Sequence, residues 1–414
     1  DHRRGQLLKL NRSAGSLLER IDHGAADISH GEVPFLEQLV DRGVVIREGG
    51  TAPPPAGGTA GEAPASRDGA LIDELNAYAE ARRIPLHCQL ELTHRCGLGC
   101  AHCYLPAARR RARPDAPGAE LTTAEIRRFL DALAGLGGLF LALTGGDPFL
   151  RPDLEAIFDH ARDRRFAVSL LTSGHGADRG ALERMAARGI DTVQVSLHGA
   201  DAAAHDRFTG VSGSFDEALG LLAFLAEIGA HPRAAVTVTR RNRDRLEETL
   251  ERLHGMGVPA ALTLYLQPRR DGRTGPQKLA ISEREIAEVL AIKPPVERPR
   301  FETRSLEDPM CSLAGNVVSV GPTGLVYPCL SFRRAGGSLR DDPLEKIWKE
   351  SSLFEYLRKI RIADLADCPE CEVRATCNRC PGFAVAEGLT EREHTDFDCC
   401  QSRVLALLSR KQGG

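Results

Sequence analysis

The chain has 414 residues, which at about 150 residues per domain predicts two to three domains. Its hydrophobic (42%) and charged (27%) fractions are those of an ordinary soluble protein. The net charge of −3 argues against a binder of nucleic acid or anionic membrane, which is normally basic.

Neither a membrane span nor a signal peptide is evident. No run approaches the roughly 18 apolar residues of a spanning helix, and the first ten residues are polar and basic. We therefore expect a cytoplasmic protein with no nucleic acid and no membrane as partner.

Residues 1–48 predict a small N-terminal domain. Leu7 to Leu10 form a strand-like run, and Ala14, Leu17, Leu18 and Ile21 recur on one face of a helix. A second helix around Phe35 to Val40 ends at Gly43, before a strand at Val44 to Ile46. Residues 49–69, rich in Gly, Ala and Pro, predict a flexible linker.

Residues 70–299 alternate strand and helix patterns. A capping box at Thr122 and Glu125 opens one helix, which buries Ile126, Phe129, Leu130 and Leu133. This alternation predicts a parallel sheet with right-handed crossovers. Six strands fall short of a closed barrel, so we expect an α/β partial (β/α)6 barrel of the TIM type, its site at the carboxyl ends of the strands. The strands are expected at Leu86–Thr93, Leu139–Thr144, Ala167–Thr172, Thr192–Leu197, Ala234–Thr239 and Ala261–Leu266.

The cysteines are bunched. Of the twelve, four fall between Cys88 and Cys103 and eight between Cys311 and Cys400. In a long chain without a secretion signal, bunched thiols indicate metal ligands more than disulfides. Residues 300–414 are loop-rich and predict a domain that folds around metal and not around a large apolar core. Cys88, inside the first strand, is expected to be a core residue.

Cys96, Cys100 and Cys103 lie in the loop after the first strand, at the expected site. Three thiolates so close together can converge on one metal centre. Three ligands would leave one iron of a four-iron cluster open to another molecule. A zinc site and chance clustering are the alternatives that spacing alone leaves open.

This C-x3-C-x2-C pattern, followed by Tyr104, resembles the signature of the radical S-adenosylmethionine (SAM) enzymes. Later strand ends carry further resembling segments: Gly145-Gly146-Asp147-Pro148 is similar to the family's GGEP segment, with Asp147 in place of Glu. The resemblance implies that a set of residues near these strand ends binds the cofactors. They are Tyr104, Gly145, Gly146, Asp147, Thr172, Ser173, Ser196 and Arg207.

The resemblance also implies a mechanism. A [4Fe-4S] cluster on Cys96, Cys100 and Cys103 would bind SAM through its open iron. Reductive cleavage of SAM would then give a 5′-deoxyadenosyl radical that abstracts a substrate hydrogen. The electron would come from an external donor such as flavodoxin or ferredoxin.

The C-terminal cysteines resemble the SPASM extension of radical SAM enzymes, which carries two auxiliary iron–sulfur clusters. The resemblance implies that Cys311, Cys329 and Cys380 hold the nearer cluster. It assigns the outer cluster to Cys368, Cys371, Cys377 and one of Cys399 or Cys400. The fourth ligand and the nuclearity of the nearer cluster stay open. Structural zinc is the alternative for the two CxxC pairs.

Residues 1–48 resemble, in part, the (PqqD-like) leader-recognition element of peptide-modifying enzymes, which takes a precursor peptide as an added strand. A purely structural winged-helix-like cap is the alternative. We therefore predict a radical SAM/SPASM oxidoreductase that crosslinks, epimerises or similarly modifies a ribosomally made precursor peptide with a leader. The alternatives are an enzyme of the same architecture acting on a small molecule, a tetrapyrrole or a folded protein residue, and a non-catalytic metal scaffold.

Overall fold

The computed structural model describes residues 67–111, 120–292 and 305–410. The chain divides into two compact units, Asp1–Tyr78 and Ala79–Gly414. Of the first unit only residues 67–78 are described, as part of helix α3 (Arg67–Arg82). The predicted domain at residues 1–48, including its leader-recognition element, lies outside the described residues. None of the helices in the described ranges has the length and apolarity that crossing a bilayer requires.

A nine-stranded sheet organises the second unit, in the order β6-β5-β4-β3-β2-β1-β7-β8-β9. The first six strands are parallel, which confirms the predicted partial barrel, and each begins within two residues of its expected start. Their bounds are β1 (His87–Thr93), β2 (Phe140–Gly145), β3 (Ala167–Thr172), β4 (Thr192–Ser196), β5 (Pro232–Thr237) and β6 (Ala260–Thr263).

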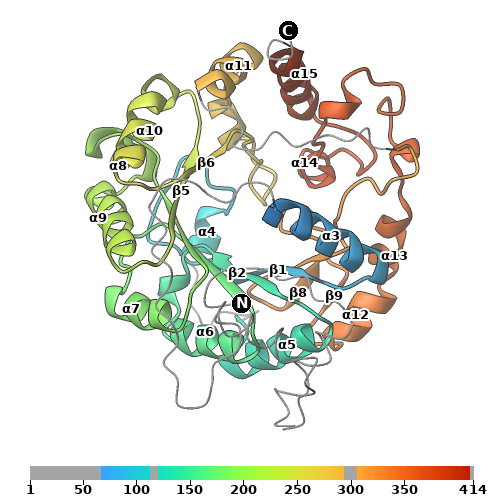
Figure 1. The fold of residues 1–414 in the computed structure, drawn as a ribbon, viewed down its shortest axis with the longest axis horizontal. Helices are drawn as coiled ribbons and strands as arrows, with labels where there is room; N and C mark the ends of the chain where they lie inside the picture. The colour runs from blue at the N-terminus through green and yellow to red at the C-terminus, as the bar shows by residue number, and fades with distance from the viewer. Residues whose placement is uncertain (1–66, 112–119, 293–304, 411–414) are drawn as a thin grey trace, which may run out of the picture. The chain divides into compact units, whose positions relative to one another are not determined.

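Helices cover the outer face of these strands, as Figure 1 shows. The predicted capping box opens α5, because the Thr122 side chain accepts from the Glu125 backbone N–H and the Glu125 carboxylate accepts from the Thr122 N–H. The α-helices are α5 (Thr123–Gly135), α6 (Leu154–Asp163), α7 (Arg179–Ala187), α8 (Ala202–Thr209), α9 (Ser214–Glu227), α10 (Leu246–Gly255) and α11 (Glu283–Ile292). Short 3-10 turns are η1 (Pro148–Leu150), η2 (Arg243–Arg245) and η3 (Pro276–Leu279).

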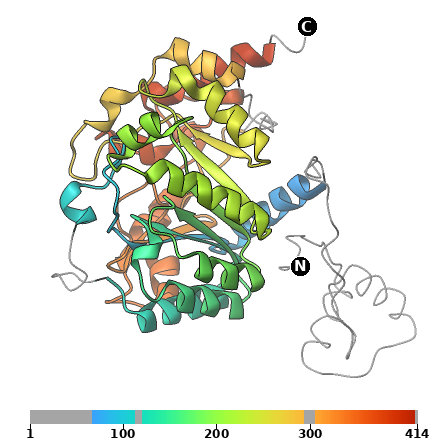
Figure 2. The same cartoon turned by 90° about the vertical axis from the view of Figure 1, so that its left-hand side faces the viewer.

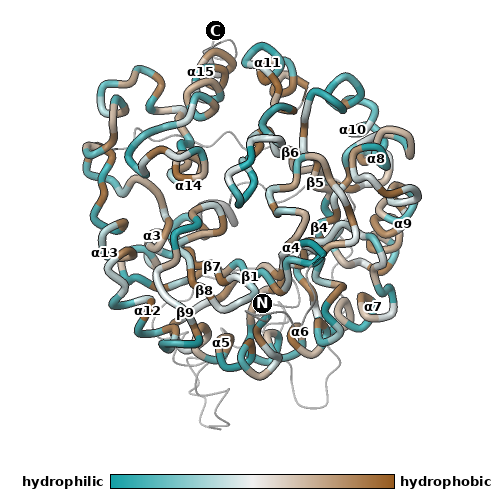
Figure 3. The backbone as a smooth tube through the Cα atoms, turned by 180° about the vertical axis from the view of Figure 1, so that it is seen from behind, coloured by the Kyte–Doolittle hydropathy of each residue, from teal (hydrophilic) through white to brown (hydrophobic). Residues whose placement is uncertain are grey.

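The core lies between the sheet and these helices. The four residues predicted as the buried face of α5 are all buried, and Cys88 is a core residue, as expected. Coloured by hydropathy, the strands around β1 are hydrophobic and the peripheral loops are hydrophilic (Figure 3). The apolar sheet thus holds the carboxyl ends of β1 to β6 at one edge of a rigid scaffold.

The C-terminal region extends the same sheet. Strand β7 (Val317–Val320) pairs with β1 in parallel, and β8 (Leu325–Tyr327) and β9 (Gly337–Ser338) follow antiparallel. The expectation of a block folded around metal without a large core is therefore incomplete, because Val318, Val320 and Trp348 belong to the main hydrophobic core. The remaining helices are α12 (Leu344–Glu350), η4 (Ile362–Asp364), α13 (Ser352–Lys359), η5 (Arg374–Thr376), α14 (Pro381–Ala386) and α15 (Asp396–Arg410).

The same region also contacts the far edge of the open sheet. Tyr265, just after β6, stacks on Phe383 of α14 with ring centroids 3.6 Å apart, and its hydroxyl donates to Glu387 at 2.8 Å. Arg403 of α15 pairs with Glu283 of α11 at 3.0 Å. The C-terminal region therefore packs at both edges of the six parallel strands, through β7 beside β1 and through α14 beside the end of β6.

Candidate active site and auxiliary metal centres

The loop after β1 carries Cys96, Cys100 and Cys103 and runs into the short helix α4 (Ala107–Arg110). Three backbone hydrogen bonds hold it: Cys96 N–H to Arg110 O (3.1 Å), Gly99 N–H to Thr209 O (2.7 Å) and Ala101 N–H to Phe208 O (3.2 Å). In the side view, α4 (cyan) lies at one end of the sheet (Figure 2). Because β1 is parallel to its neighbours, the loop stands at the carboxyl edge, where the sequence places the site.

The three thiols are close enough to influence one another electrostatically. Burial is the main cause that raises the pKa of Cys96 to about 11 and of Cys100 to about 12, and the neighbouring sulfurs add to it. Such thiols stay protonated at neutral pH unless a cation compensates their charge. Metal ions bind the thiolate form, so a bound metal centre would supply that compensation.

Gly145 and Gly146, at the end of β2, pass directly over the backbone of the cysteine loop. A Cβ atom at Gly145 would lie 2.1 Å from Thr93 O, and one at Gly146 would lie 2.1 Å from Arg95 O. Gly145 also has φ +136°, where side chains are strained. The fold therefore requires glycine at both positions to bring the end of β2 against the loop.

Asp147 turns toward β3. Its carboxylate accepts hydrogen bonds from Thr172 Oγ1 (3.0 Å) and Ser173 N–H (2.9 Å), and from the Ser173 hydroxyl. The side chain is 2% exposed, and burial raises the pKa of Asp147 despite these donors. Asp147, Thr172 and Ser173 thus join the ends of β2 and β3. Any contact that these residues make to SAM, as predicted, would involve atoms that already form these hydrogen bonds.

The other predicted cofactor residues are spread along the same edge. Ser196 is half-buried at the end of β4, and Arg207 is exposed on α8, where it lines a surface pocket with Arg241 and Asn242. Tyr104 lies against β1 and points its hydroxyl at Glu91, 3.4 Å away. Their contacts to SAM stay predictions.

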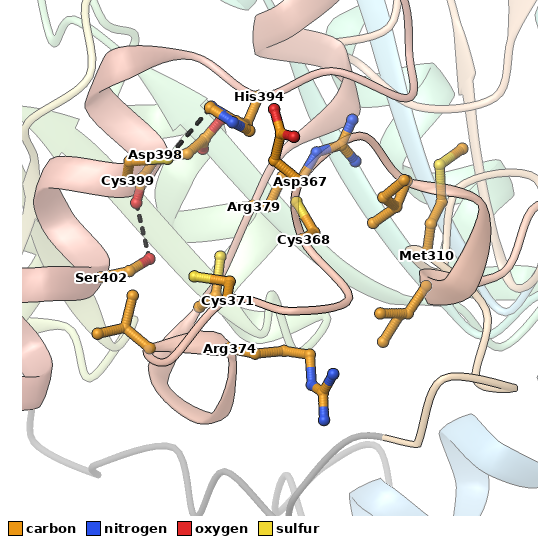
Figure 4. A pocket seen from close by; sticks show the side chains of 14 residues that line it. Met310, Asp367, Cys368, Cys371, Arg374, Arg379, His394, Asp398, Cys399 and Ser402 are labelled. Carbon is orange, nitrogen blue, oxygen red and sulfur yellow. Dashed lines mark hydrogen bonds between the residues drawn. The ribbon is translucent and has the colours of Figure 1, made fainter.

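The C-terminal cysteines form two groups. Cys311, Cys329 and Cys380 are near one another, and burial together with the other two sulfurs raises the pKa of Cys329 to about 12. The second group lines a cavity, shown in Figure 4 with Arg379 and His394. Its members are Cys368, Cys371, Cys377 and Cys399.

Two adjacent cysteines of α15, Cys399 and Cys400, lie in different surroundings. Cys399 lines the cavity of the second group, with its sulfur 3.2 Å from His394 Nδ1. Cys400 is buried elsewhere, hydrogen-bonded to Glu283 of α11. Of the two alternatives that the sequence leaves open, the structure brings Cys399 to the other three cysteines and Cys400 away from them.

Comparison with known proteins agrees with this division of sites. Residues 90–253 match the model of the radical SAM superfamily, and residues 311–381 match SPASM, an iron–sulfur cluster-binding domain. The chain therefore contains a radical SAM domain and a SPASM domain. The two matches span the loop of Cys96 to Cys103 and most of the C-terminal cysteines.

The chain is similar to curated proteins over most of their length. It is 27% identical to the AdoMet-dependent heme synthase of Methanosarcina barkeri, covering 72% of this chain and 91% of that protein. It is 28% identical to the PqqA peptide cyclase of Granulibacter bethesdensis, covering 77% and 88%. Its fold resembles that of Streptococcus suis SuiB, solved with the precursor peptide SuiA, with a TM-score of 0.60, 15% identity and 88% of each chain covered.

A radical SAM domain uses a [4Fe-4S] cluster and SAM, and a SPASM domain binds auxiliary iron–sulfur clusters. Within the described ranges, no three Cys, His, Asp or Glu side chains converge on a position for a single metal ion. A four-iron cluster needs no such convergence, because each thiolate binds a different iron. The mutually close thiols of each group fit such clusters.

One buried ion-pair network at the radical SAM site was missed from the sequence. Glu91 of β1 is fully buried; Arg270 Nη2 donates to its Oε1 at 2.6 Å, and Arg333 Nη2 lies 3.1 Å from its Oε2. Arg270 also packs over Tyr104, with its guanidinium carbon 4.6 Å from the ring centroid. The acid therefore links β1, the residue after Cys103, the loop after β6 and the SPASM segment after Cys329. Glu91 is the one acidic residue of β1, beside the buried Leu90 and Leu92, and this was the signal that could have revealed the network.

Replacing Gly146 with alanine should lower stability by about 1–3 kcal/mol, as overpacking does. The new methyl group would meet backbone oxygens of His94 and Arg95 that no side-chain rotation can clear. SAM binding, measured by calorimetry on the anaerobic protein, should weaken with it, because the cysteine loop and the end of β2 would separate. Gly255→Ala is the control, since nothing lies within 4 Å of its added carbon, and it should leave both quantities near wild type.

Proposed function

We propose that this protein matures a ribosomally made precursor peptide by radical chemistry, as an oxidoreductase that crosslinks, epimerises or similarly modifies its substrate. With its cluster and SAM bound, the site supplies hydrogen-atom abstraction from an unactivated carbon. The chain's own residues would bind the cluster and SAM, orient the substrate and exclude solvent.

The cysteine loop provides the first of these roles. Cys96, Cys100 and Cys103 would hold the SAM-binding cluster and leave one iron without a protein ligand. Gly145 and Gly146 hold the end of β2 against this loop with no side chain between. By their resemblance to the GGEP segment, their backbone would contact the SAM amino group. Ser196 and Arg207 would meet the ribose and carboxylate, the latter as a charge-assisted contact.

The C-terminal cysteines suit an oxidative outcome. The two groups would hold auxiliary clusters, the outer one on Cys368, Cys371, Cys377 and Cys399. Such clusters can accept the electron that a substrate radical must lose when a new bond forms. An external donor such as flavodoxin or ferredoxin would reduce the SAM-binding cluster. The cytoplasm is the compartment we propose for this protein, because its thiols stay reduced there and available as cluster ligands.

The similarity to a peptide cyclase, over 77% of this chain and 88% of that protein, carries the peptide proposal. The fold it shares with SuiB and the resemblance of residues 1–48 to a leader-recognition element support it. The heme synthase match has a similar identity, so a small molecule or tetrapyrrole is the second candidate substrate class.

The test is to co-express the chain with the short peptide encoded beside its gene and to analyse the peptide by mass spectrometry. A crosslink should appear as the loss of two hydrogen atoms, and an epimerised residue as deuterium uptake in heavy water. The Cys96→Ala, Cys100→Ala, Cys103→Ala variant is the control and should leave the peptide unchanged. Failure to bind or modify the peptide, with turnover of a tetrapyrrole or another metabolite, would overturn the proposal in favour of the second candidate.

A further inference from the structure

Arg379 lies in the shortest link between the two auxiliary cysteine groups. It stands between Cys377, which lines the outer cavity, and Cys380, which belongs with Cys311 and Cys329. The side chain is 8% exposed and lines the outer cavity itself (Figure 4). Its charge acts on Cys368 and Cys377 of the outer group and on Cys311 of the nearer group. One guanidinium is thus placed in the electrostatic range of both metal centres.

Backbone carbonyls fix the position of this guanidinium. Nε donates to Glu393 O at 2.9 Å, and Nη2 donates to the carbonyl oxygens of Glu391 and Glu393. Nη1 is buried and has no hydrogen-bond partner in the described part of the chain. An arginine held on two nitrogens therefore has its third nitrogen free to donate inside the protein.

No carboxylate in the described ranges forms an ion pair with Arg379. Asp398 acts on Arg379 electrostatically, but that carboxylate accepts from the Cys380 N–H (3.2 Å) and from the Thr395 hydroxyl (2.9 Å). A buried charge without an anionic partner is costly, so a compensating negative charge is expected nearby. Cysteine thiolates bound to iron–sulfur clusters would supply it on both sides of the side chain.

We propose that Arg379 is a positioning residue that sets the reduction potentials of both auxiliary clusters, by holding one positive charge between them and donating Nη1–H to cysteine sulfur. Hydrogen bonds to cluster sulfurs and nearby charge are the means by which proteins tune such potentials. A positive charge favours the reduced form, so Arg379 makes both clusters better electron acceptors. The proposal depends on the two clusters and not on the nature of the substrate.

The test is a redox titration of the anaerobically reconstituted full chain, followed by electron paramagnetic resonance. The signal that changes when SAM is added belongs to the cluster of Cys96, Cys100 and Cys103 and serves as the internal standard. In Arg379→Gln, both other couples should shift to lower potential. We expect the ratio of reduced to oxidised cluster at a given potential to fall about tenfold, which is about 59 mV for a one-electron couple.

Two further variants separate charge from structure. Arg162→Gln is the matched control, because Arg162 of α6 likewise donates to backbone carbonyls, those of Phe166 and Arg188, but does not line the cavity, and it should leave both potentials unchanged. Arg379→Lys keeps the charge and should retain most of the wild-type potentials.

Iron content and reduction potential, measured on the same samples, together test the proposed role of Arg379. Full iron loading of Arg379→Gln with both couples shifted supports the proposal. Full loading with no shift, or with a shift of one couple alone, overturns it. If the glutamine variant fails to load, a loaded lysine variant with near wild-type potentials supports the proposal, and loss of iron in both variants shows a purely structural role and overturns it.

Discussion

A variant in which Cys96, Cys100 and Cys103 are all alanine is expected to form no 5′-deoxyadenosine from SAM. These three thiols are the ligands available where the carboxyl ends of the strands meet, and Gly146 brings the end of β2 to them. Without the trio, no iron remains beside the proposed SAM site. The measurement is chromatography of the nucleoside after anaerobic reduction, with iron and sulfide analysis on the same sample.

The iron analysis sharpens this expectation. The triple variant should lose about four irons per chain, the content of one cubane cluster, and keep those of the C-terminal groups. Cys88→Ala is the control: that thiol is 2% exposed in the core of β1, eight residues before Cys96, and its loss should change neither iron content nor nucleoside formation. Nucleoside production by the triple variant would show that the first metal centre has been assigned to the wrong residues.

The sequence predicted the parallel strands well because each is a short apolar run between a helix and a turn. Local signals of this kind need no knowledge of distant residues: the capping box at Thr122, the glycines after β2 and the spacing of Cys96, Cys100 and Cys103 all lie within a few positions. The same holds for the two CxxC pairs of the SPASM domain.

What the sequence could not give depends on contacts between distant segments. Strand β7 pairs with β1, for example Val317 with His87, and no local pattern announces that partner. Cys399 and Cys400 are neighbours on one helix, so only the packing of α15 on α11 decides which thiol turns to the cavity. Glu91 pairs with Arg270 and Arg333, which lie far along the chain. The sequence alone therefore does not show which groups compensate its buried charge.

That ion-pair network leads to the second large effect. Replacing Glu91 with glutamine should destabilise the protein by about 3–5 kcal/mol, the cost of removing one member of a buried pair. Glu91 is fully buried, and the side chains of Arg270 and Arg333 are only 17% and 20% exposed, so neither arginine can regain full hydration. At about 2.1 cal/mol/K per residue over 414 residues, the melting temperature of the anaerobic protein should fall by about 3–6 °C.

The pH dependence has a definite sign. Burial alone would raise the pKa of Glu91, but the nearby His94 and the charges of Arg270 and Arg333 outweigh it and hold the pKa well below its usual range. A carboxyl group with a lowered pKa stabilises the fold above its unfolded value of 4.5, and this contribution disappears as the pH falls through the folded value. The difference in melting temperature between wild type and variant should therefore be constant near neutrality and shrink only below about pH 4.5.

Two comparisons test whether the cost comes from the stranded charges. Glu155→Gln breaks an exposed pair with Arg184 and should cost no more than about 1 kcal/mol. Adding Arg333→Gln to Glu91→Gln should recover part of the lost stability, because it removes one of the two charges left without a partner. If the double variant is instead less stable by the sum of the single effects, Glu91 and Arg333 are not coupled. Glu91 would then not be the tie that holds the SPASM segment after Cys329 against the first strand of the radical SAM domain.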